Sequence, residues 1–305
     1  MLNHKQEVLT FLHINKIDIL LISESHFTNL TVFKVPHYNV YHTPHPDGTA
    51  HGGTTLIIRK IISHYELSPY QTNKIQATVV EIKTMPWRLT VAAIDSPPRR
   101  SISTDEYKDF LQTLGNRFII GGDWNAKHTQ WGSRLTTSKG RNLWRAMSDS
   151  NYDYISNGAP TYWPADPRKL PDLLDFFVSH GLRRNNYLIH SNFDLSSDHT
   201  PVIVSLSAAA INKPTPPTLT TRNTDWNTLQ NYLKKNTNLN IRLKSPTDLD
   251  KAAHYFTTLV QKAAWLSTPA ADQQATLTSN TPLRSRQLVA AKRRARRVWQ
   301  RSAPV

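Results

Sequence analysis

Side chains able to do acid–base or metal chemistry recur beside apolar runs in this sequence. They are carboxylates, one amide and one imidazole: Glu24, Asp123, Asn125, Asp175, Asp198 and His199. Asp123 and Asn125 stand two residues apart, so the carboxylate can accept a proton from one water molecule while the amide fixes the orientation of that water. Oxygen ligands in a chain without cysteine suit a hard cation, Mg²⁺ or Mn²⁺, which commonly bridges to phosphate.

Most of these residues also have an ordinary structural interpretation. Glu24 directly follows an apolar run and could be the solvated end of a strand. Asp123 and Asn125 could form an Asx turn after a strand, with Gly121 and Gly122 letting the backbone turn sharply. The sequence pattern alone leaves these alternatives open.

Asp175 is harder to explain as a surface residue. It lies inside the otherwise apolar run 173–179, and a buried charge needs a partner. His199, next to Asp198 at the entrance to another apolar run, is the candidate partner. We therefore expect a hydrogen bond between Asp175 and the imidazole of His199.

Short runs rich in Val and Ile predict the strands that must position these side chains. Each run has the length of a strand and is bounded by turn residues: 17–23, 54–59, 77–82, 89–94, 118–120, 173–179 and 201–206. Helical patterns alternate with them at 5–14, 104–114 and 139–148, and Ser103 with Glu106 gives the second helix a capping-box pattern. This alternation predicts a layered α/β domain.

The positive charge of the chain is concentrated in its last third. The 305 residues carry a formal net charge of +15. Residues 1–212 contain 21 Lys and Arg against 18 Asp and Glu, whereas residues 213–305 contain 16 against 4. The absence of cysteine excludes a disulfide framework and a thiol nucleophile. No apolar run approaches the roughly 20 residues of a membrane span, so we expect no membrane partner.

Four blocks of the sequence, in their order and spacing, resemble the endonuclease/exonuclease/phosphatase superfamily: LLISESHF, GGDWNA, LLDFFVS and SSDHTPVIVSL. The longer stretches around them, including PTYWPADPRKLPDLLDFF, look like the apurinic-endonuclease-like domain of jockey-type non-LTR retrotransposon polyproteins. The resemblance covers residues 1–207 almost continuously. It implies a four-layered α/β sandwich of two mixed β-sheets flanked by helices.

The resemblance also implies a role for each candidate residue. Glu24 would bind the divalent metal, with Asp198 assisting the position of metal or water. Asp123 would activate the attacking water and Asn125 would orient it. His199 would contact the phosphate and stabilise the transition state, with Asp175 holding its imidazole.

Two departures from the family pattern predict an impaired enzyme. The family has an Asn at the end of a first strand before the first helix, and this chain begins at that helix. The family also places a Tyr before the Pro-Pro pair, where Asp95 stands here, so an anion occupies the position of a phosphate contact. We expect a truncated or decayed copy of the element.

The resemblance and the composition together predict three parts of the chain. Residues 1–210 form the catalytic domain, 211–222 a linker rich in Pro and Thr, and 223–305 a basic helical connector toward a reverse transcriptase that is absent here. The connector holds the candidate nucleic-acid-binding residues: Lys292, Arg293, Arg294, Arg296 and Arg297. Such a helix can contact a nucleic-acid backbone, act as a nuclear-import signal, or be a solvated linker.

The function expected from this sequence is that of a metal-dependent DNA endonuclease of a retrotransposon. It would nick target DNA in the nucleus and leave a 3′-hydroxyl that primes reverse transcription, with DNA and the RNA of the element as partners. One alternative is a stand-alone phosphoesterase of the same superfamily that acts on abasic DNA, a phosphoinositide or a nucleotide. The other is a degenerate remnant that binds nucleic acid without catalysis.

Overall fold

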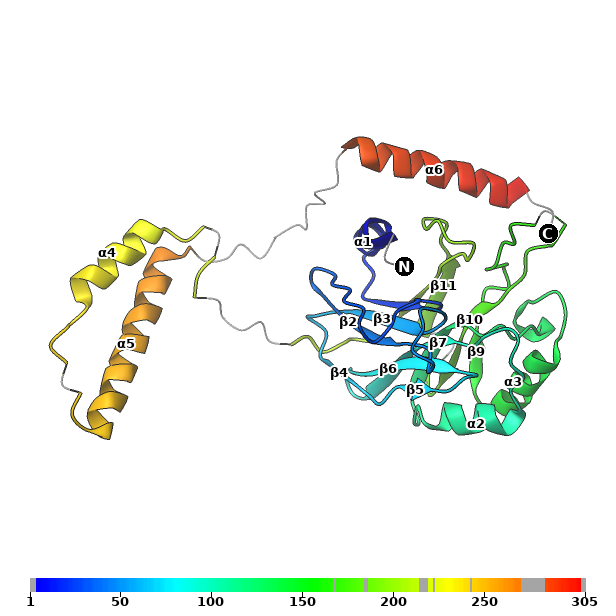
Figure 1. Ribbon diagram of the computed structural model, residues 1–305, viewed down its shortest axis with the longest axis horizontal. Helices are drawn as coiled ribbons and strands as arrows, with labels where there is room; N and C mark the ends of the chain where they lie inside the picture. Colours follow the sequence, from blue (N-terminus) through cyan, green and yellow to red (C-terminus); the bar gives the residue numbers. More distant parts are fainter. Residues whose placement is uncertain are drawn as a thin grey trace. The chain divides into compact units, whose positions relative to one another are not determined.

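The computed structural model of the chain divides into two units, and each is described by itself (Figure 1). Unit 1 comprises Met1–Lys213 and Ser279–Val305, and unit 2 comprises Pro214–Thr278. The structure describes residues 4–166, 168–183, 186–213, 219–221, 223–241, 243–269 and 283–302. Within 283–302 it does not describe the side chains of 283–286, 289, 293, 297 and 300–302.

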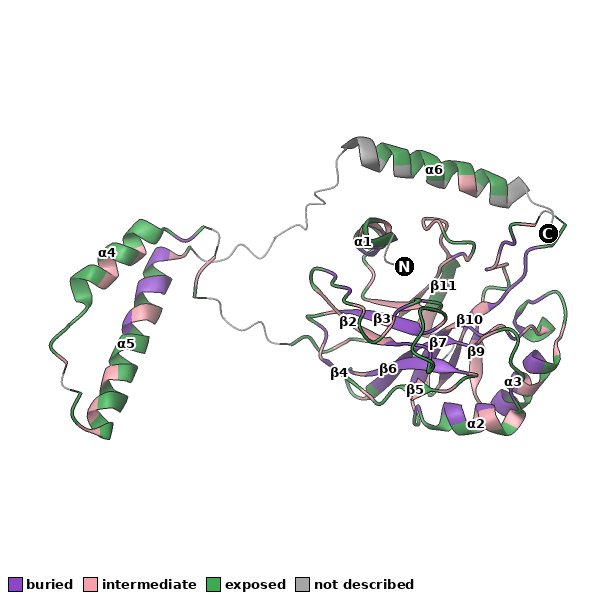
Figure 2. Ribbon diagram, in the orientation of Figure 1, coloured by how far each residue is buried: buried purple, intermediate pink, exposed green. Residues whose placement is uncertain are grey.

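A seven-stranded mixed sheet lies at the centre of unit 1, in the order β4-β6-β7-β8-β10-β9 with β5 beside β6. Its strands are β4 (His64–Glu66), β5 (Tyr70–Gln71), β6 (Gln76–Lys83), β7 (Arg88–Asp95), β8 (Phe118–Asp123), β9 (Asp153–Ile155) and β10 (Asp175–His180). β7 and β8 run parallel, and the other neighbours are antiparallel. Nearly every residue of β6, β7 and β8 is buried, as expected for apolar strands covered on both faces (Figure 2).

Smaller antiparallel sheets pack on one face of the large sheet. β1 (Ile19–Ile22), β3 (Thr54–Arg59) and β2 (Tyr38–Thr43) form one sheet, and β11 (Tyr187–Ser191) pairs with β12 (Val202–Leu206). Leu56 and Ile58 of β3 and Val204 of β12 join the same apolar cluster as Val80 and Val91 of the large sheet. Both small sheets therefore belong to one layer.

Helices cover the two outer faces. The helices α2 (Thr104–Gln112) and α3 (Ser138–Asp149) bury Phe110, Leu143 and Met147 against the far face of the large sheet. α1 (Lys5–Ile14) packs Val8 and Leu12 on the three-stranded sheet. These contacts give the four-layered α/β sandwich that the sequence predicts, and the capping box at Ser103 is present as well.

The element boundaries differ from the sequence prediction at the two positions that matter for the site. β8 continues through Gly121 and Gly122 to Asp123, so the glycines lie in a strand rather than in a turn. β10 begins at Asp175, which places this carboxylate at the end of a strand and not within one. Both differences place a carboxylate at a strand end, and the two strand ends are neighbours in the sheet.

The remaining elements are helical. Unit 2 contains α4 (Trp226–Asn236) and α5 (Pro246–Ser267), and α6 (Leu283–Ser302) groups with unit 1. Half of the predicted linker, 214–218 and 222, lies outside the described residues. Ile211 bonds through its backbone to Ser63 and Lys83, so unit 1 extends past residue 210. Within the described part of the chain, every helix is too short or too polar to cross a membrane.

Candidate active site

Three carboxylates lie side by side where neighbouring strands of the large sheet end. Asp95 on β7 is in register with Asp123 on β8, and Asp123 is in register with Asp175 on β10. Residues directly opposite on adjacent strands have side chains on the same face and Cβ atoms about 4.5–5.5 Å apart. The fold therefore gathers three acidic side chains at the neighbouring ends of β7, β8 and β10.

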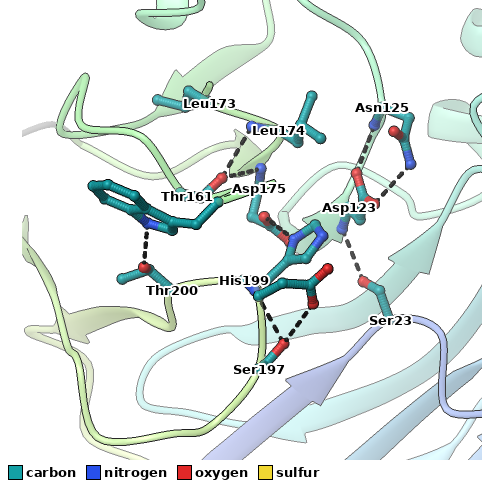
Figure 3. A network of polar contacts seen from close by, with 12 residues as sticks. Ser23, Asp123, Asn125, Thr161, Leu173, Leu174, Asp175, Ser197, His199 and Thr200 are labelled. Atoms are coloured by element: carbon teal, nitrogen blue, oxygen red, sulfur yellow. Dashed lines mark hydrogen bonds and ion pairs between the residues drawn. The ribbon is translucent and has the colours of Figure 1, made fainter. Parts of the chain in front are cut away.

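The predicted contact between Asp175 and His199 is confirmed. Oδ2 of Asp175 lies 2.6 Å from Nδ1 of His199, and both side chains are mostly buried (Figure 3). Thr161 fixes the strand end, because its Oγ1 accepts the backbone N–H groups of Leu174 and Asp175 at 2.9 Å each. This contact engages Nδ1 of His199 and not Nε2.

The loop that carries His199 is held from two sides. The backbone N–H of His199 donates to Oγ of Ser197 at 3.0 Å. The ring of Tyr162 packs beside the imidazole of His199, with ring centroids 5.0 Å apart. The backbone N–H of Thr200 donates to the carbonyl of Thr161 at 2.6 Å. The imidazole is thus anchored through the same threonine that anchors Asp175.

Asp123 is fixed by its neighbours on both sides. Its backbone N–H donates to Oγ of Ser23 at 2.8 Å, and that hydroxyl donates to the carbonyl of Ile94 at 2.6 Å. Asn125 donates to both carboxylate oxygens, through its backbone N–H at 2.8 Å and its side-chain Nδ2 at 2.7 Å (Figure 3). The Asx turn is therefore present, and it holds Asp123 and Asn125 together in the site.

Gly122 permits the close approach of these strands. Its φ is +144°, and a Cβ atom there would lie 2.2 Å from the carbonyl oxygen of Ile94 and 2.6 Å from Oγ of Ser23. A side chain at this position would push Asp123 away from β7.

Burial and neighbouring charges shift the pKa values of the acidic and imidazole side chains of the site. Burial, followed by the charges of Asp175 and Asp95, raises the pKa of Asp123 well above its usual value. Burial and the charge of Glu24 raise the pKa of Asp95 to about 7. Burial favours neutral His199, yet the charge and hydrogen bond of Asp175 raise the pKa of the imidazole to about 9. At neutral pH the pair is an imidazolium beside a carboxylate.

Lys139 supplies a buried positive charge that the sequence analysis did not assign to the site. Its Nζ donates to the carbonyls of Ser96 and Pro97 at 3.0 and 2.9 Å, and it acts electrostatically on Asp123 and Asp95. Burial lowers its pKa to about 8, an effect that the two carboxylates partly offset. In the sequence this lysine looks like an ordinary residue of a helix.

Asp95 occupies a fully buried position beside Glu24. The backbone N–H groups of Gly53 and Glu24 bond to its carboxyl group. Among the residues that the structure describes, its buried Oδ2 has no hydrogen-bond partner, and the same holds for Oε1 of Gln76, which lies opposite Asp95 on β6. Around Asp95 the described residues thus offer more hydrogen-bond acceptors than donors.

This donor set fits a hard divalent cation. Burial and the charges of Asp175 and Asp95 raise the pKa of Asp123, and Oδ2 of Asp95 is an oxygen that no hydrogen-bond donor of the described residues contacts. Oxygen ligands in excess of positive charge are what Mg²⁺ and Mn²⁺ require.

The two residues predicted to bind the metal lie on different loops of this region. Glu24, at φ +49°, acts electrostatically on Asp95, and exposed Asp198 acts on His199. In the described part of the chain, neither Glu24 nor Asp198 belongs to a group of three or more His, Asp or Glu residues whose ligand atoms lie within 4.8 Å of one another. Their sharing of one cation stays a prediction.

Part of the basic helix α6 contacts the loop that carries His199. Nζ of Lys292 lies 2.5 Å from Oγ of Ser196, and Arg296 donates to the carbonyl of Leu195 at 2.9 Å. The ring of Trp299 lies 5.7 Å from that of Trp163. Arg294 is exposed, and the side chains of Arg293 and Arg297 lie outside the described ones. Two of the predicted nucleic-acid-binding cations therefore sit near the candidate site.

The sequence is similar to retrotransposon proteins. Residues 90–203 match a family model described as Endonuclease-reverse transcriptase. The chain is 33% identical over 301 residues to the RNA-directed DNA polymerase from mobile element jockey of Drosophila funebris, covering 97% of this chain and 33% of that protein. It is 34% identical over 303 residues to the probable RNA-directed DNA polymerase from transposon X-element of Drosophila melanogaster, with the same coverage. The chain spans about a third of the length of the curated relatives it matches.

The fold is similar to those of solved endonucleases. The endonuclease domain of TRAS1, a telomere-specific non-LTR retrotransposon, matches with a TM-score of 0.56 at 23% identity, covering 66% of this chain and 91% of that one. The AP endonuclease LMAP from Leishmania major matches with a TM-score of 0.52 at 14% identity, covering 70% and 83%. At these identities the likeness concerns the fold.

Proposed function

We propose that the strand-end cluster hydrolyses a phosphodiester bond of DNA with a divalent metal ion. The chain belongs to the apurinic-endonuclease-like domains of non-LTR retrotransposons, and this membership supports the proposal. The observation that carries it is that Asp175, which pairs with His199, lies in register with buried Asp123. A paired imidazolium and a carboxylate of raised proton affinity are the two groups that such a hydrolysis requires.

The imidazolium of His199 binds the scissile phosphate. Asp175 holds Nδ1, so Nε2 can donate to a phosphate oxygen and stabilise the charge that grows in the transition state. The raised pKa keeps this donor positively charged at neutral pH. Tyr162 and Thr161 hold the loop and the strand end, and therefore act as positioning residues.

Asp123 accepts the proton of the attacking water. Burial, followed by the charge of Asp175, raises the pKa of Asp123, so its ionised form is a stronger base than an exposed aspartate. Asn125 bonds to both oxygens of this carboxylate and orients it toward the water. Ser23 fixes the backbone from which the carboxylate projects.

Glu24, assisted by Asp198, would hold a divalent cation, for which Mg²⁺ or Mn²⁺ fits the oxygen ligands. When bound, such an ion neutralises phosphate charge and lowers the proton affinity of nearby carboxylates.

We further propose that the reaction is slow in this chain. Asp95 is buried at the strand end beside Asp123, and an anion there repels a phosphate. Loss of one hydrogen-bond donor to a developing charge costs about 10²–10³ in rate. The non-catalytic alternative rests on the same residue, and the similarity to polymerase proteins argues against a stand-alone phosphoesterase.

Analysis of the reaction products distinguishes these functions. Nicked plasmid should be extended by a DNA polymerase without repair of the ends, because the nick carries a 3′-hydroxyl. Hydrolysis of an abasic-site duplex, a nucleotide or a phosphoinositide at a greater rate than intact DNA would favour the stand-alone phosphoesterase. Binding of DNA without product formation, with Mg²⁺ or Mn²⁺ present, would favour the non-catalytic remnant. A DNA substrate also implies that the protein acts in the nucleus.

A further inference from the structure

The loop between β2 and β3 gathers two imidazoles and one carboxylate beside the strand-end cluster, and none of the three belongs to that cluster. His45, Asp47 and His51 each contribute one ligand atom, and these atoms lie within 4.8 Å of one another. Nδ1 of His45 lies 3.0 Å from Oδ1 of Asp47, and Nε2 of His51 lies 3.5 Å from Oδ2 of Asp47. The two imidazole rings are tilted against each other by 38°, with centroids 4.0 Å apart.

These separations are close to those between ligands of a tetrahedral metal centre. Bonds of about 2.0–2.2 Å from Zn²⁺ to nitrogen or oxygen place neighbouring ligand atoms about 3.3–3.6 Å apart. The separations of 3.0 and 3.5 Å involve the two different oxygens of Asp47. Each imidazole therefore lies near coordination spacing from the carboxylate, and all three ligand atoms lie within 4.8 Å of one another.

The hydroxyl of Thr49 links two residues of the cluster. Its Oγ1 donates to Oδ1 of Asp47 at 3.0 Å and also contacts Nδ1 of His51. In the tautomer whose Nδ1–H donates to this hydroxyl, the lone pair of Nε2 is free to bind a metal ion. A polar partner on the second ring nitrogen is the usual outer contact of a metal-binding histidine.

Nδ1 of His45 faces the carboxylate of Asp47. It lies 3.0 Å from Oδ1 of Asp47, and the backbone N–H of Asp47 lies 3.4 Å from the same nitrogen. A metal ion would take the place of the proton between this imidazole and the carboxylate.

We propose that His45, Asp47 and His51 bind a divalent transition-metal ion of the Zn²⁺ class. Two imidazoles and one carboxylate suit Zn²⁺ or Co²⁺, whereas the oxygen-only set at the strand ends suits Mg²⁺. The side chain of His45 is 10% exposed, but those of Asp47 and His51 are 46% and 53% exposed. A fourth ligand from solvent can therefore complete the coordination.

The position of this loop gives the ion a structural effect on the strand-end cluster. The carbonyls of Gly52 and Gly53 accept the backbone N–H groups of His26 and Ser25 at 2.9 and 3.0 Å. A Cβ atom on Gly52 would lie 3.1 Å from Oδ2 of Asp95 and 3.8 Å from the ring of His45. An ion that fixes the loop would stiffen the support of Glu24 and Asp95.

Titration of the full chain with Co²⁺ in excess Mg²⁺ tests this site without any reading of nuclease activity. We expect one equivalent of Co²⁺ to give the intense visible bands of a tetrahedral centre, and Zn²⁺ to displace it. His51→Ala and Asp47→Asn should each weaken Co²⁺ binding at least about tenfold. His13→Ala removes an exposed imidazole from α1 and serves as the matched control.

Further variants separate this site from the proposed active site. Glu24→Gln and Asp123→Ala should leave the Co²⁺ affinity unchanged. The proposal is overturned if Co²⁺ does not bind stoichiometrically, or if His51→Ala and Asp47→Asn bind it as the unmodified chain does. Equal loss of binding in Glu24→Gln would place the ion at the strand ends and would also overturn the proposal.

Discussion

The pairing of Asp175 with His199 determines the charge of the imidazole that faces the candidate substrate site. Burial alone would favour the neutral ring, and the neighbouring carboxylate reverses that preference. Because the folded-state pKa of about 9 lies above the ordinary value of 6.5, the pair stabilises the fold fully below about pH 6.5. This contribution is lost as the pH rises through about 9.

Removing the carboxylate should lower the pKa of His199. In Asp175→Asn the imidazole keeps a hydrogen-bond partner but loses the negative charge, so burial prevails. Titration of the metal-free chain by NMR of the imidazole nitrogens measures the shift, with the signal of exposed His190 as the internal control. An unchanged His199 titration in the variant would show that Asp175 does not set the charge of the ring.

Substituting the buried anion at Asp95 should accelerate DNA nicking. Asp95→Asn keeps the shape of the side chain and removes a charge whose pKa is about 7. If the chain with ionised Asp95 is inactive, Asp95→Asn should nick DNA about tenfold faster than the unmodified chain at pH 8. At lower pH the two rates should become equal. Asp109→Asn, on the exposed face of α2, is the control. A variant that is slower at every pH would mean that the carboxylate assists the reaction.

At the scale of elements, β8 brings the site together because two glycines let its neighbours approach. At Gly121 a Cβ atom would lie 2.3 Å from the ring of Phe177, and Gly122 faces the carbonyl of Ile94 and the hydroxyl of Ser23. The strand can therefore lie tightly between β7 and β10 and align its carboxylate with theirs.

Gly122→Ala should destabilise the fold by about 3 kcal/mol or more, because the new methyl group overlaps a backbone carbonyl and requires a strained φ. Gly48→Ala is the control, since Gly48 has φ +76° but nothing within 4 Å of its Cβ position, and about 1 kcal/mol is expected. Urea unfolding followed by circular dichroism measures both. Equal losses would show that backbone strain alone, and not the close approach of β7, demands glycine at 122.

Much of the layered fold could be predicted from periodicity. β3, β6, β7 and β8 each contain a short apolar run with Val or Ile, and α1 and α2 have clear apolar stripes. The sequence pattern does not predict β4, β5 and β9, because two or three residues show no period. It also does not predict β2 and β11, in which polar residues interrupt or shorten the apolar run.

The membership of the site was only partly predictable. Asp175 and His199 could be paired because a carboxylate in an apolar run requires a partner. The register that aligns Asp95 with Asp123 depends on which strands are neighbours, and no local pattern encodes that. Lys139 reaches the site from a helix only through tertiary packing.

At the scale of the whole molecule, the basic charge gathers in a helix that contacts the loop of the candidate site. Lys292 and Arg296 of α6 bond to the segment that precedes Asp198, so cations of this helix lie near the site. Binding of DNA by α6 is a prediction that follows from this charge.

Neutralising α6 should reduce the salt dependence of DNA binding. The triple variant Lys292→Gln, Arg294→Gln and Arg296→Gln removes three cations, so the slope of log affinity against log salt should fall by up to about 2.7. Lys234→Gln with Lys235→Gln neutralises the basic end of α4 as a control. Fluorescence anisotropy at several salt concentrations measures the slopes. If the control lowers the slope by a similar amount for each charge removed, the attraction to DNA is diffuse and α6 makes no specific contribution.

The central claim is that the strand-end cluster cleaves DNA with a divalent metal, and the conversion of supercoiled plasmid to nicked circles tests it most directly. The assay compares the unmodified chain with Asp123→Ala, in Mg²⁺ and in Mn²⁺, with and without EDTA. We predict slow nicking that EDTA stops and that Asp123→Ala abolishes, because this carboxylate is the base for the attacking water. Nicking that persists in Asp123→Ala, or the absence of EDTA-sensitive nicking in both the unmodified chain and Asp95→Asn, would contradict the claim.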